Sequence, residues 1–429
     1  MEKFFKLKEN NTNVRTEIIA GITTFMTMAY IIFVNPDILS STGMPQPALV
    51  TATILAAAVS TILMGLVTNY PFALASGMGL NAFFAFTVAP QYGWEAALGA
   101  VLISGIVFFL LGALGIINEI DKAIPTSLKR AVAAGIGLFI ALIGLSQAGI
   151  IVSNAPATIV ALGDIKTGTA ALALVGLIIT GVLMALRVKG AILIGILLTT
   201  VIGMFTGETQ IPRSLGDLVG APASLSPILF KLDFPGAIKL GFMVIFSLLF
   251  VDMFDTLGTL MGAAARAGYL DKDGRLPKIR QAMLVDAFGT MFGALLGTST
   301  VTTYVESTAG ISEGGRTGLT AVTTGVLFLL ALFFTPLALL VPGAATAPAL
   351  VIVGVLMMGA IKGIDFEDFT EAFPAFLALA MMPFAYSIAD GIAAGFVAYP
   401  LVKVAAGRFK EVHWFSYVLF VVSLAHFLL

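Results

Sequence analysis

Two carboxylates, Asp252 and Asp255, lie in the apolar run FSLLFVDMFDTLGTLMG, which has the character of a membrane-crossing helix. Their spacing predicts that both side chains project from one face of that helix. Thr256 adds a hydroxyl group one turn after Asp252. A carboxylate at mid-bilayer costs roughly 2.5–3.5 kcal/mol unless it is paired, hydrated or protonated. These residues are therefore candidates for binding a ligand or for carrying a proton.

A third carboxylate, Glu306, and the amide Asn81 lie in segments that do not have the pattern of plain helices. The β-branched run Thr300–Val305 favours an extended chain, and Gly77 and Gly79 permit unusually close backbone approaches. Extended backbone at membrane depth is tolerated only where protein or a cavity surrounds it. We expect the two stretches to pair, with Asn81 and Glu306 at the N-terminal ends of the half-helices that follow.

The alternative is that these glycines are packing notches and these threonines cap helices, which leaves Glu306 without an explanation. No Lys or Arg lies within the spans concerned, so the carboxylates must be matched by backbone N–H groups, a substrate, a cation or a proton. The predicted substrate-binding residues are Asn81, Asp252, Glu306, Gly79 and Thr303. The predicted proton-coupling residues are Asp255, Asp252 and Glu306. The expected coupling ion is H⁺, with Na⁺ as the alternative, and no other cofactor or metal is expected.

Other acidic residues have simpler explanations. Asp286, in QAMLVDAFGTM, is expected to be an internal packing group or a partner of Arg280 about two turns earlier. Glu313 and Arg316, three residues apart in SEGGRTG, are expected to form a local ion pair that orders a tight loop.

Composition narrows the class of protein. Of the 429 residues, 59% are hydrophobic and only 11% are charged, whereas soluble domains carry about 25% charged residues. The chain has no Cys and only two His, His413 and His426, which excludes thiolate chemistry and most His-based zinc sites and triads. A net charge of -1 gives no basic field for nucleic acid. A polytopic membrane protein in contact with lipid remains: a transporter, a channel or a lipid-facing enzyme.

The apolar runs predict an all-α polytopic membrane protein with about fourteen spans. Residues 1–206 form a first set of seven, 207–237 an extracytoplasmic linker, and 238–410 a second set of seven. Residues 411–429 form an apolar helix that either crosses the membrane again or lies in its interface. Lys and Arg in short loops place the N-terminus in the cytoplasm. Because each set holds an odd number of spans, the second is inverted relative to the first, as in many secondary transporters.

Three long motifs resemble the AzgA-like purine permeases, which belong to the nucleobase–ascorbate (nucleobase:cation symporter) family. These motifs are PFALASGMGLNAFFAFTVA, FVDMFDTLGTLMG and TSTVTTYVESTAGISEGGRTGLTA, and the N-terminal stretch TEIIAGITTFMTMAYIIFVNPDIL is also typical. The resemblance runs essentially from end to end. It implies two inverted seven-span repeats in a uracil-transporter-like fold, with short β-strands in spans 3 and 10. It also implies a core domain of residues 15–122 plus 238–341 and a gate domain of residues 127–206 plus 346–406.

The resemblance further implies a multi-pass protein of the bacterial cytoplasmic membrane, with homodimers through the gate domain. It places Asn81 of span 3, Asp252 and Asp255 of span 8, and Glu306 of span 10 at the substrate site. A single carboxylate can accept both the N1–H and the 2-amino group of guanine, and Glu306 is the first choice for that role. The amide of Asn81 can read O6 and N7 or an adenine amino group. The candidate stacking residues are Phe83, Phe84, Phe246, Phe250 and Tyr304.

The sequence thus predicts a secondary active transporter, not an enzyme, that imports guanine, hypoxanthine or adenine by H⁺ symport with alternating access. One alternative is an anion transporter of the same fold, moving sulfate or bicarbonate, although site carboxylates without a site cation have the wrong sign. A second is a uracil or xanthine permease; those branches carry Glu and His where this chain has Asp252 and Thr256. A third is an intramembrane enzyme, whose acid pair would ordinarily come from two different segments.

Overall fold

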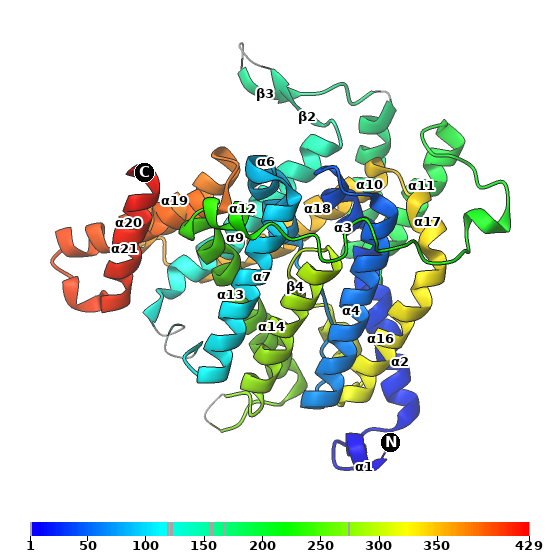
Figure 1. The fold of residues 1–429 in the computed structure, drawn as a ribbon, viewed down its shortest axis with the longest axis horizontal. Helices are drawn as coiled ribbons and strands as arrows, with labels where there is room; N and C mark the ends of the chain where they lie inside the picture. Colours follow the sequence, from blue (N-terminus) through cyan, green and yellow to red (C-terminus); the bar gives the residue numbers. More distant parts are fainter. Residues whose placement is uncertain are drawn as a thin grey trace.

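The computed structural model describes residues 2–117, 120, 123–154, 158–166, 168–272 and 275–428. Residues 1, 122 and 429, which serve as domain boundaries above, lie outside these ranges. Most of the described chain is helical, and the helices lie side by side with a small central strand pair and an outlying hairpin (Figure 1).

The first half of the chain consists of helices and three short β-strands. Its helices are α1 (Glu2–Phe5), α2 (Val14–Met28), α3 (Ile31–Ser40), α4 (Gln46–Thr68), α5 (Met78–Phe83), the π-helix η1 (Phe84–Val88), α6 (Ala89–Tyr92), α7 (Trp94–Leu114), α9 (Thr126–Gln147), α10 (Gly168–Ala185) and α11 (Ala191–Thr206). Its strands are β1 (Leu74–Ser76), β2 (Ile151–Asn154) and β3 (Thr158–Leu162).

The second half begins after a loop that contains the 3-10 turn η2 (Leu215–Asp217). Its helices and single strand are α12 (Phe234–Lys239), α13 (Phe242–Ala267), α14 (Ile279–Leu296), β4 (Val301–Thr303), α15 (Ser307–Ser312), α16 (Gly318–Ala331), η3 (Leu332–Phe334), α17 (Thr335–Leu340), α18 (Gly343–Met358), η4 (Gly359–Gly363), α19 (Phe369–Phe384), α20 (Ile388–Ala405), η5 (Phe409–Glu411) and α21 (Trp414–Leu428).

The protein is a multi-pass membrane protein. Within the described residues, 10 helical segments are long and apolar enough to cross a membrane. The helices α11, α19 and α21 are equally apolar but have only 15 or 16 residues. Fewer long helices are present than the fourteen predicted spans. The third segment of each half is broken into a strand and a half-helix, and α11 and α19, at two further predicted spans, are too short to be counted.

The helices pack in two groups. In one group, α4 packs against α14 and α16, α2 against α16, and α7 against α14. In the other, α9 packs against α18 and α19, α19 against α20, and α10 against α11 and α18. Glycines permit the closest approaches: a Cβ atom on Gly65 would lie 2.5 Å from the carbonyl oxygen of Gly318, and one on Gly137 would lie 2.8 Å from that of Gly354. Small residues of this kind are typical of helix contacts in membranes.

Strands β1 and β4 lie at the centre of the molecule and pair antiparallel, with Leu74 opposite Thr303 and Ser76 opposite Val301. All residues of both strands are buried. The N–H of Gly77 extends the pairing by donating to the carbonyl of Thr300 at 3.1 Å. The N–H groups of Ala73 and Leu74 donate to the hydroxyls of Ser307 and Thr61, each at 2.9 Å. Partners inside the protein are the condition for non-helical chain at membrane depth.

Two peripheral features complete the fold. The hairpin β2–β3, which the apolar pattern did not predict, projects from the upper end of the molecule in Figure 1. The last helix, α21, packs antiparallel along α20: the hydroxyl of Ser416 donates to the carbonyl of Ala123 at 3.3 Å, and His426 contacts Asp390 at 2.8 Å. The start of α21 is therefore held to the segment before α9, and its end to the start of α20.

Candidate substrate site

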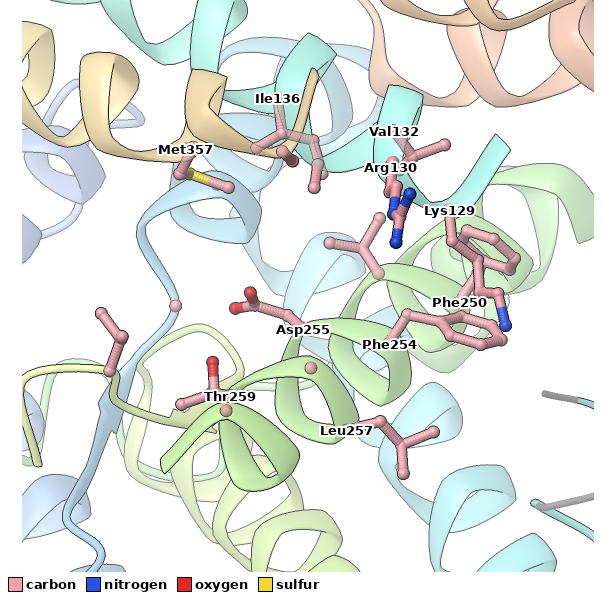
Figure 2. Close-up of a pocket in the computed structure, with 18 of the residues that line it drawn as sticks. Lys129, Arg130, Val132, Ile136, Phe250, Phe254, Asp255, Leu257, Thr259 and Met357 are labelled. Carbon is pink, nitrogen blue, oxygen red and sulfur yellow. The ribbon is translucent and has the colours of Figure 1, made fainter. Parts of the chain in front are cut away.

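A cavity of about 470 Å³ lies between α9, α13, the turn from β1 into α5, and η4. Its volume falls within the range of roughly 300–1,000 Å³ that is typical of small-molecule sites. The wall is largely apolar, with Ile136, Phe250, Phe254 and Met357 among its members (Figure 2). The cavity therefore has the size and surface expected for a small, flat, mostly apolar ligand that offers a few polar groups.

Asp255 supplies a carboxylate to this cavity. Its side chain is exposed on the wall and points into the open space between α13 and the facing helices (Figure 2). Among the described residues, no hydrogen bond or salt bridge to this carboxylate is formed. A carboxylate in this state is available to a ligand N–H group or to a proton.

Asp252 occupies a different environment, so the predicted shared face is wrong. Its side chain is 1% exposed and turns toward α14, where the hydroxyl of Thr290 donates to Oδ2 at 2.7 Å. Three residues of α-helix fall about 60° short of a full turn. That rotation places Asp252 inside the helix packing and Asp255 on the cavity. The Oδ1 atom of Asp252 is buried without a hydrogen-bond partner among the residues that the structure describes.

Asp286 is an internal packing group, one of the two roles expected for it. It is buried and accepts hydrogen bonds from Thr256 at 2.8 Å and from Thr303 at 2.9 Å. Arg280 is not its partner, because that guanidinium donates to the backbone carbonyl of Ala113. The hydroxyl of Thr303 is thus directed at Asp286, and Thr303 is not among the residues that line the cavity.

Glu306 is the residue before α15 and accepts a hydrogen bond of 2.7 Å from the hydroxyl of Tyr30. Its neighbour Val305 lines the cavity, whereas Glu306 itself is half-buried beside it. The expected ion pair between Glu313 and Arg316 is wrong. Glu313 pairs with Lys189, and the guanidinium of Arg316 donates to backbone carbonyls of its own turn.

Asn81 and Gly79 lie on α5, directly after the strand. Neither amide atom of the buried Asn81 side chain has a hydrogen-bond partner among the described residues. Such buried unpaired groups are uncommon in folded proteins and point to a functional role. Gly79 lines the cavity, and a Cβ atom there would lie 2.3 Å from Cγ2 of Ile136 on α9. Only a glycine lets α9 rest this closely on α5.

Most lining residues escaped the sequence-based prediction, among them Phe254, Lys129 and Arg130. Phe254 follows Phe250 by one helical turn, so the cavity face of α13 was detectable from that spacing alone. Lys129 and Arg130 also line the wall, which corrects the expectation of a site without cations. The Lys129 Nζ lies 5.4 Å from the centre of the Phe254 ring, and Arg130 donates to the carbonyl of Gly363. In the sequence, the positive charges of Lys129 and Arg130 indicated only a loop at the membrane surface.

The aromatic residues that the sequence suggested for stacking differ in whether they line the cavity. All four of Phe250, Phe83, Phe84 and Tyr304 are buried, and of these only Phe250 lines the cavity. The Tyr304 hydroxyl donates to the carbonyl of Ser76 at 2.5 Å and so braces the strand pair. Within the described ranges, no group of three His, Asp or Glu side chains is arranged to hold a metal ion.

Comparison with solved structures supports the fold. The transmembrane domain of the cyanobacterial bicarbonate transporter BicA superposes with a TM-score of 0.68 over 89% of this chain and 97% of that one, at 16% sequence identity. At that identity the likeness concerns the fold alone.

Relatives of known name are much more similar in sequence. The guanine/hypoxanthine permease PbuG of Bacillus subtilis is 46% identical, with 100% of this chain and 99% of that protein covered. The adenine permease AdeP of Escherichia coli is 44% identical, with 96% and 92% covered. Residues 15–394 match the xanthine/uracil permease family. Members of this permease family are transporters rather than enzymes. The resemblance found in the motifs is thereby confirmed, and the chain belongs to the xanthine/uracil permease family of nucleobase transporters.

Proposed function

We propose that this protein is a secondary active transporter that imports purine nucleobases, guanine and hypoxanthine foremost and adenine as a further candidate. The observation that carries the proposal is the unpaired carboxylate of Asp255 on the wall of a largely apolar cavity. Relatives named as guanine/hypoxanthine and adenine permeases cover nearly the whole chain and support the substrate class.

Recognition would use complementary polar edges and an aromatic face. A purine base offers N–H donors that a carboxylate accepts, and we assign this role to Asp255 with Glu306 beside it. The ring of Phe250 or Phe254 offers a stacking surface. Gly79 contributes a stretch of backbone to the cavity wall beside Ile136.

The buried polar residues would complete the site. The unpaired amide of Asn81 carries both a donor and acceptors for a base edge. Asp252 has one oxygen free and is held by Thr290, while Thr303 is held by Asp286. We infer that this network fixes the strand pair and α13 relative to each other, so that the binding groups keep their geometry when the site is empty.

Proton coupling would rest on the same carboxylates. Asp255 forms no salt bridge with Lys129 or Arg130, and its carboxylate points away from Lys129 in Figure 2. A carboxylate without a fixed counter-ion at this depth is most stable when a proton or a ligand neutralises it. We propose that Asp255, with Glu306 beside it, takes up a proton together with the base and releases it on the other side.

The architecture is compatible with alternating access. Ten long helices, the shorter α11 and α19, and the two broken segments β1–α6 and β4–α15 together make the fourteen spans that we propose. The broken segment is third in each half, and the antiparallel pairing of β1 with β4 is what an inverted repeat would produce. We propose that the two packing groups form the core (15–122 plus 238–341) and gate (127–206 plus 346–406) domains, which the contacts within each group support.

The cavity lies between these two groups, at the end of the molecule where α9 begins and α13 ends. Lys and Arg near those helix ends favour the cytoplasmic side. We therefore propose an inward-facing state, in a protein of the cytoplasmic membrane whose N-terminus is also cytoplasmic. Movement of α9 against α5, where Ile136 rests on Gly79, would open and close the site.

The test is uptake of radiolabelled hypoxanthine, guanine, adenine, uracil and bicarbonate by cells that lack their own permeases for these compounds. Wild type, Asp255→Asn and the matched control Asp365→Asn would be compared at equal membrane expression, with and without a protonophore. Asp365 lies in the exposed loop after η4, away from the cavity.

We expect saturable purine uptake that the protonophore abolishes, that Asp255→Asn lowers at least tenfold, and that Asp365→Asn leaves unchanged. Bicarbonate uptake without purine uptake would instead favour the anion alternative, for which Lys129 and Arg130 on the cavity wall would be the attracting groups. Uphill, pH-dependent purine uptake by Asp255→Asn at the wild-type rate would remove Asp255 from the mechanism.

A further inference from the structure

A second cavity, of about 330 Å³, lies at the other end of α13 from the first. One side is formed by η1, α6 and the start of α13, which belong to the group of α4, α7 and α14. The other side is formed by the turn between α19 and α20 and by the end of α21. Like the main cavity, it therefore lies between the two packing groups.

Polar groups of several kinds converge on this cavity. The carboxylate of Asp390 and the imidazole of His426 lie 2.8 Å apart, with side chains 31% and 27% exposed. Across the cavity, the Nε2 atom of the exposed Gln91 donates a hydrogen bond to the carbonyl of Thr87, which leaves the side-chain oxygen of Gln91 available. Tyr386, 39% exposed, adds an aromatic ring. The cavity thus offers a ligand two hydrogen-bond acceptors, Asp390 and Gln91, an imidazole that can donate or accept, and an aromatic ring face. These groups come from both sides of the cavity.

The backbone around this cavity is also unusual. Tyr386 has φ of +57°, a left-handed conformation that a bulky side chain rarely adopts. Its carbonyl accepts a 2.9 Å hydrogen bond from Thr87, which joins the two packing groups, and its ring lies 5.4 Å from that of Phe139 in an edge contact. Residues held in such conformations cluster at ligand clamps and switch regions.

The two cavities are connected by one continuous segment. Gly79 and Leu80, at the start of α5, line the first cavity, and Phe86 and Thr87, in the π-helix that follows, line the second. Single π-turns inside helices are frequent at functional sites. Phe84 in this segment and Phe139 on α9 are both buried, and neither lines either cavity.

We propose that the second cavity is a subsite for the same class of ligand, a planar heteroaromatic base, on the membrane side opposite to the main cavity. Asp390 accepts a ring N–H, the oxygen of Gln91 accepts a second donor, His426 meets a ring nitrogen, and Tyr386 covers one face. The base rests there before the contact between Thr87 and Tyr386 opens. This inference rests on the proposed purine transport.

The experiment measures initial rates of hypoxanthine uptake as a function of concentration in cells without their own purine permeases. Asp390→Asn and Gln91→Ala alter the two sides of the subsite. Ser416→Ala is the matched control, because it removes a different hydrogen bond of α21, to the carbonyl of Ala123, without touching the cavity. Membrane expression and thermal unfolding of each purified variant show whether it is folded.

We expect Asp390→Asn and Gln91→Ala each to raise KM roughly 2- to 12-fold, the factor that corresponds to one net hydrogen bond. The maximal rate should stay within about twofold of wild type, and Ser416→Ala should leave KM unchanged. A wild-type KM in Gln91→Ala, whatever the effect of Asp390→Asn, would overturn the subsite and reduce the His426–Asp390 pair to a docking contact of α21. If Asp390→Asn is unfolded, Gln91→Ala still decides.

The failure of the two proposals can be told apart. Absence of purine uptake in folded wild-type protein would contradict the proposed function and the subsite together. Purine uptake by wild type with unchanged KM in Gln91→Ala would remove the subsite alone.

Discussion

Asp252 and Asp255 lie one turn apart on α13, yet the first is sealed against α14 and the second is open to the cavity. The sealed carboxylate has a fixed donor in Thr290, while the open one has none among the described residues. Two identical groups on one helix are thereby given different roles. We infer that Asp252 maintains the frame of the site and that Asp255 exchanges partners during transport.

Removal of the Thr290 hydroxyl should test the role of Asp252. The single O–H of Thr290 has two acceptors within reach, Asp252 at 2.7 Å and the carbonyl of Val301 at 3.1 Å, and its oxygen accepts from the N–H of Val301 at 3.2 Å. Thr290→Val should lower the free energy of unfolding by roughly 1–3 kcal/mol, because buried polar groups lose their partners. Purine uptake should fall as well. Thr290→Ser, which keeps the hydroxyl, should restore both in unfolding and uptake assays; failure to do so would contradict this assignment.

Asn81 should show opposite effects on stability and on transport. Its amide atoms are buried without partners in the described structure, a state that costs about 1–3 kcal/mol for a buried polar group. Asn81→Leu should therefore leave the empty protein as stable as wild type or more stable, while purine uptake is lost.

Asn35 is the control for this comparison, because its side chain donates to Thr53 at 2.7 Å and to Thr298 at 2.9 Å. Asn35→Leu should destabilise the protein in the same thermal unfolding assay. A clear loss of stability in Asn81→Leu would mean that the amide of Asn81 has a structural role.

The contact between Gly79 and Ile136 should control the rate of transport. A methyl group at Gly79 would meet Cγ2 of Ile136 at 2.3 Å, so Gly79→Ala should push α9 away from α5 and slow uptake. Removing the opposing methyl groups with Ile136→Ala should restore part of the rate in the double variant. The expected coupling between the two sites is about 0.5–3 kcal/mol. Gly181→Ala, on α10 with nothing within 4 Å, is the control, and additive effects of the two substitutions would contradict the contact.

A charge cluster beyond the ends of α19 and α20 should make stability depend on pH. Hydrogen bonds from Thr370 and Arg408 lower the pKa of Asp368 to about 2, and those from Arg408 and Lys403 lower the pKa of Glu411 to about 2. Ordinary values are about 3.9 and 4.3. Because the folded-state values are lowered, the stabilisation is complete above about pH 5 and is lost as the pH falls toward 2.

The melting temperature of wild type should therefore fall between pH 5 and pH 3. In Arg408→Gln it should fall less over the same range. The effect should be small, since these side chains are open to solvent and their ion pairs are screened. Melting curves of the purified protein at several pH values would measure it. Parallel curves for wild type and Arg408→Gln would show that the cluster does not contribute.

Local sequence pattern indicated the unusual backbone but not the side-chain partners. The run Thr300–Val305 favours extended chain through its own β-branched residues, and strand β4 lies within it. In contrast, Glu306 meets Tyr30 across 276 residues of sequence, and Asp286 is bound by Thr256 and Thr303 from two other segments. Such contacts depend on how whole helices pack, and neither periodicity nor spacing contains that information. The hairpin β2–β3 contains no apolar run long enough to predict it from the sequence.

The antiparallel course of α21 along α20 bears on how the protein can be handled. Its 15 residues span about 22 Å, which is shorter than the roughly 30 Å hydrocarbon core. The two ends of the chain lie at opposite ends of the molecule (Figure 1). In the proposed orientation, with the N-terminus in the cytoplasm, a hydrophilic tag at the C-terminus would have to be translocated during synthesis. It would also load a helix that is short for the bilayer. A tag ahead of Glu2 imposes neither demand, so purification handles and reporters belong at the N-terminus.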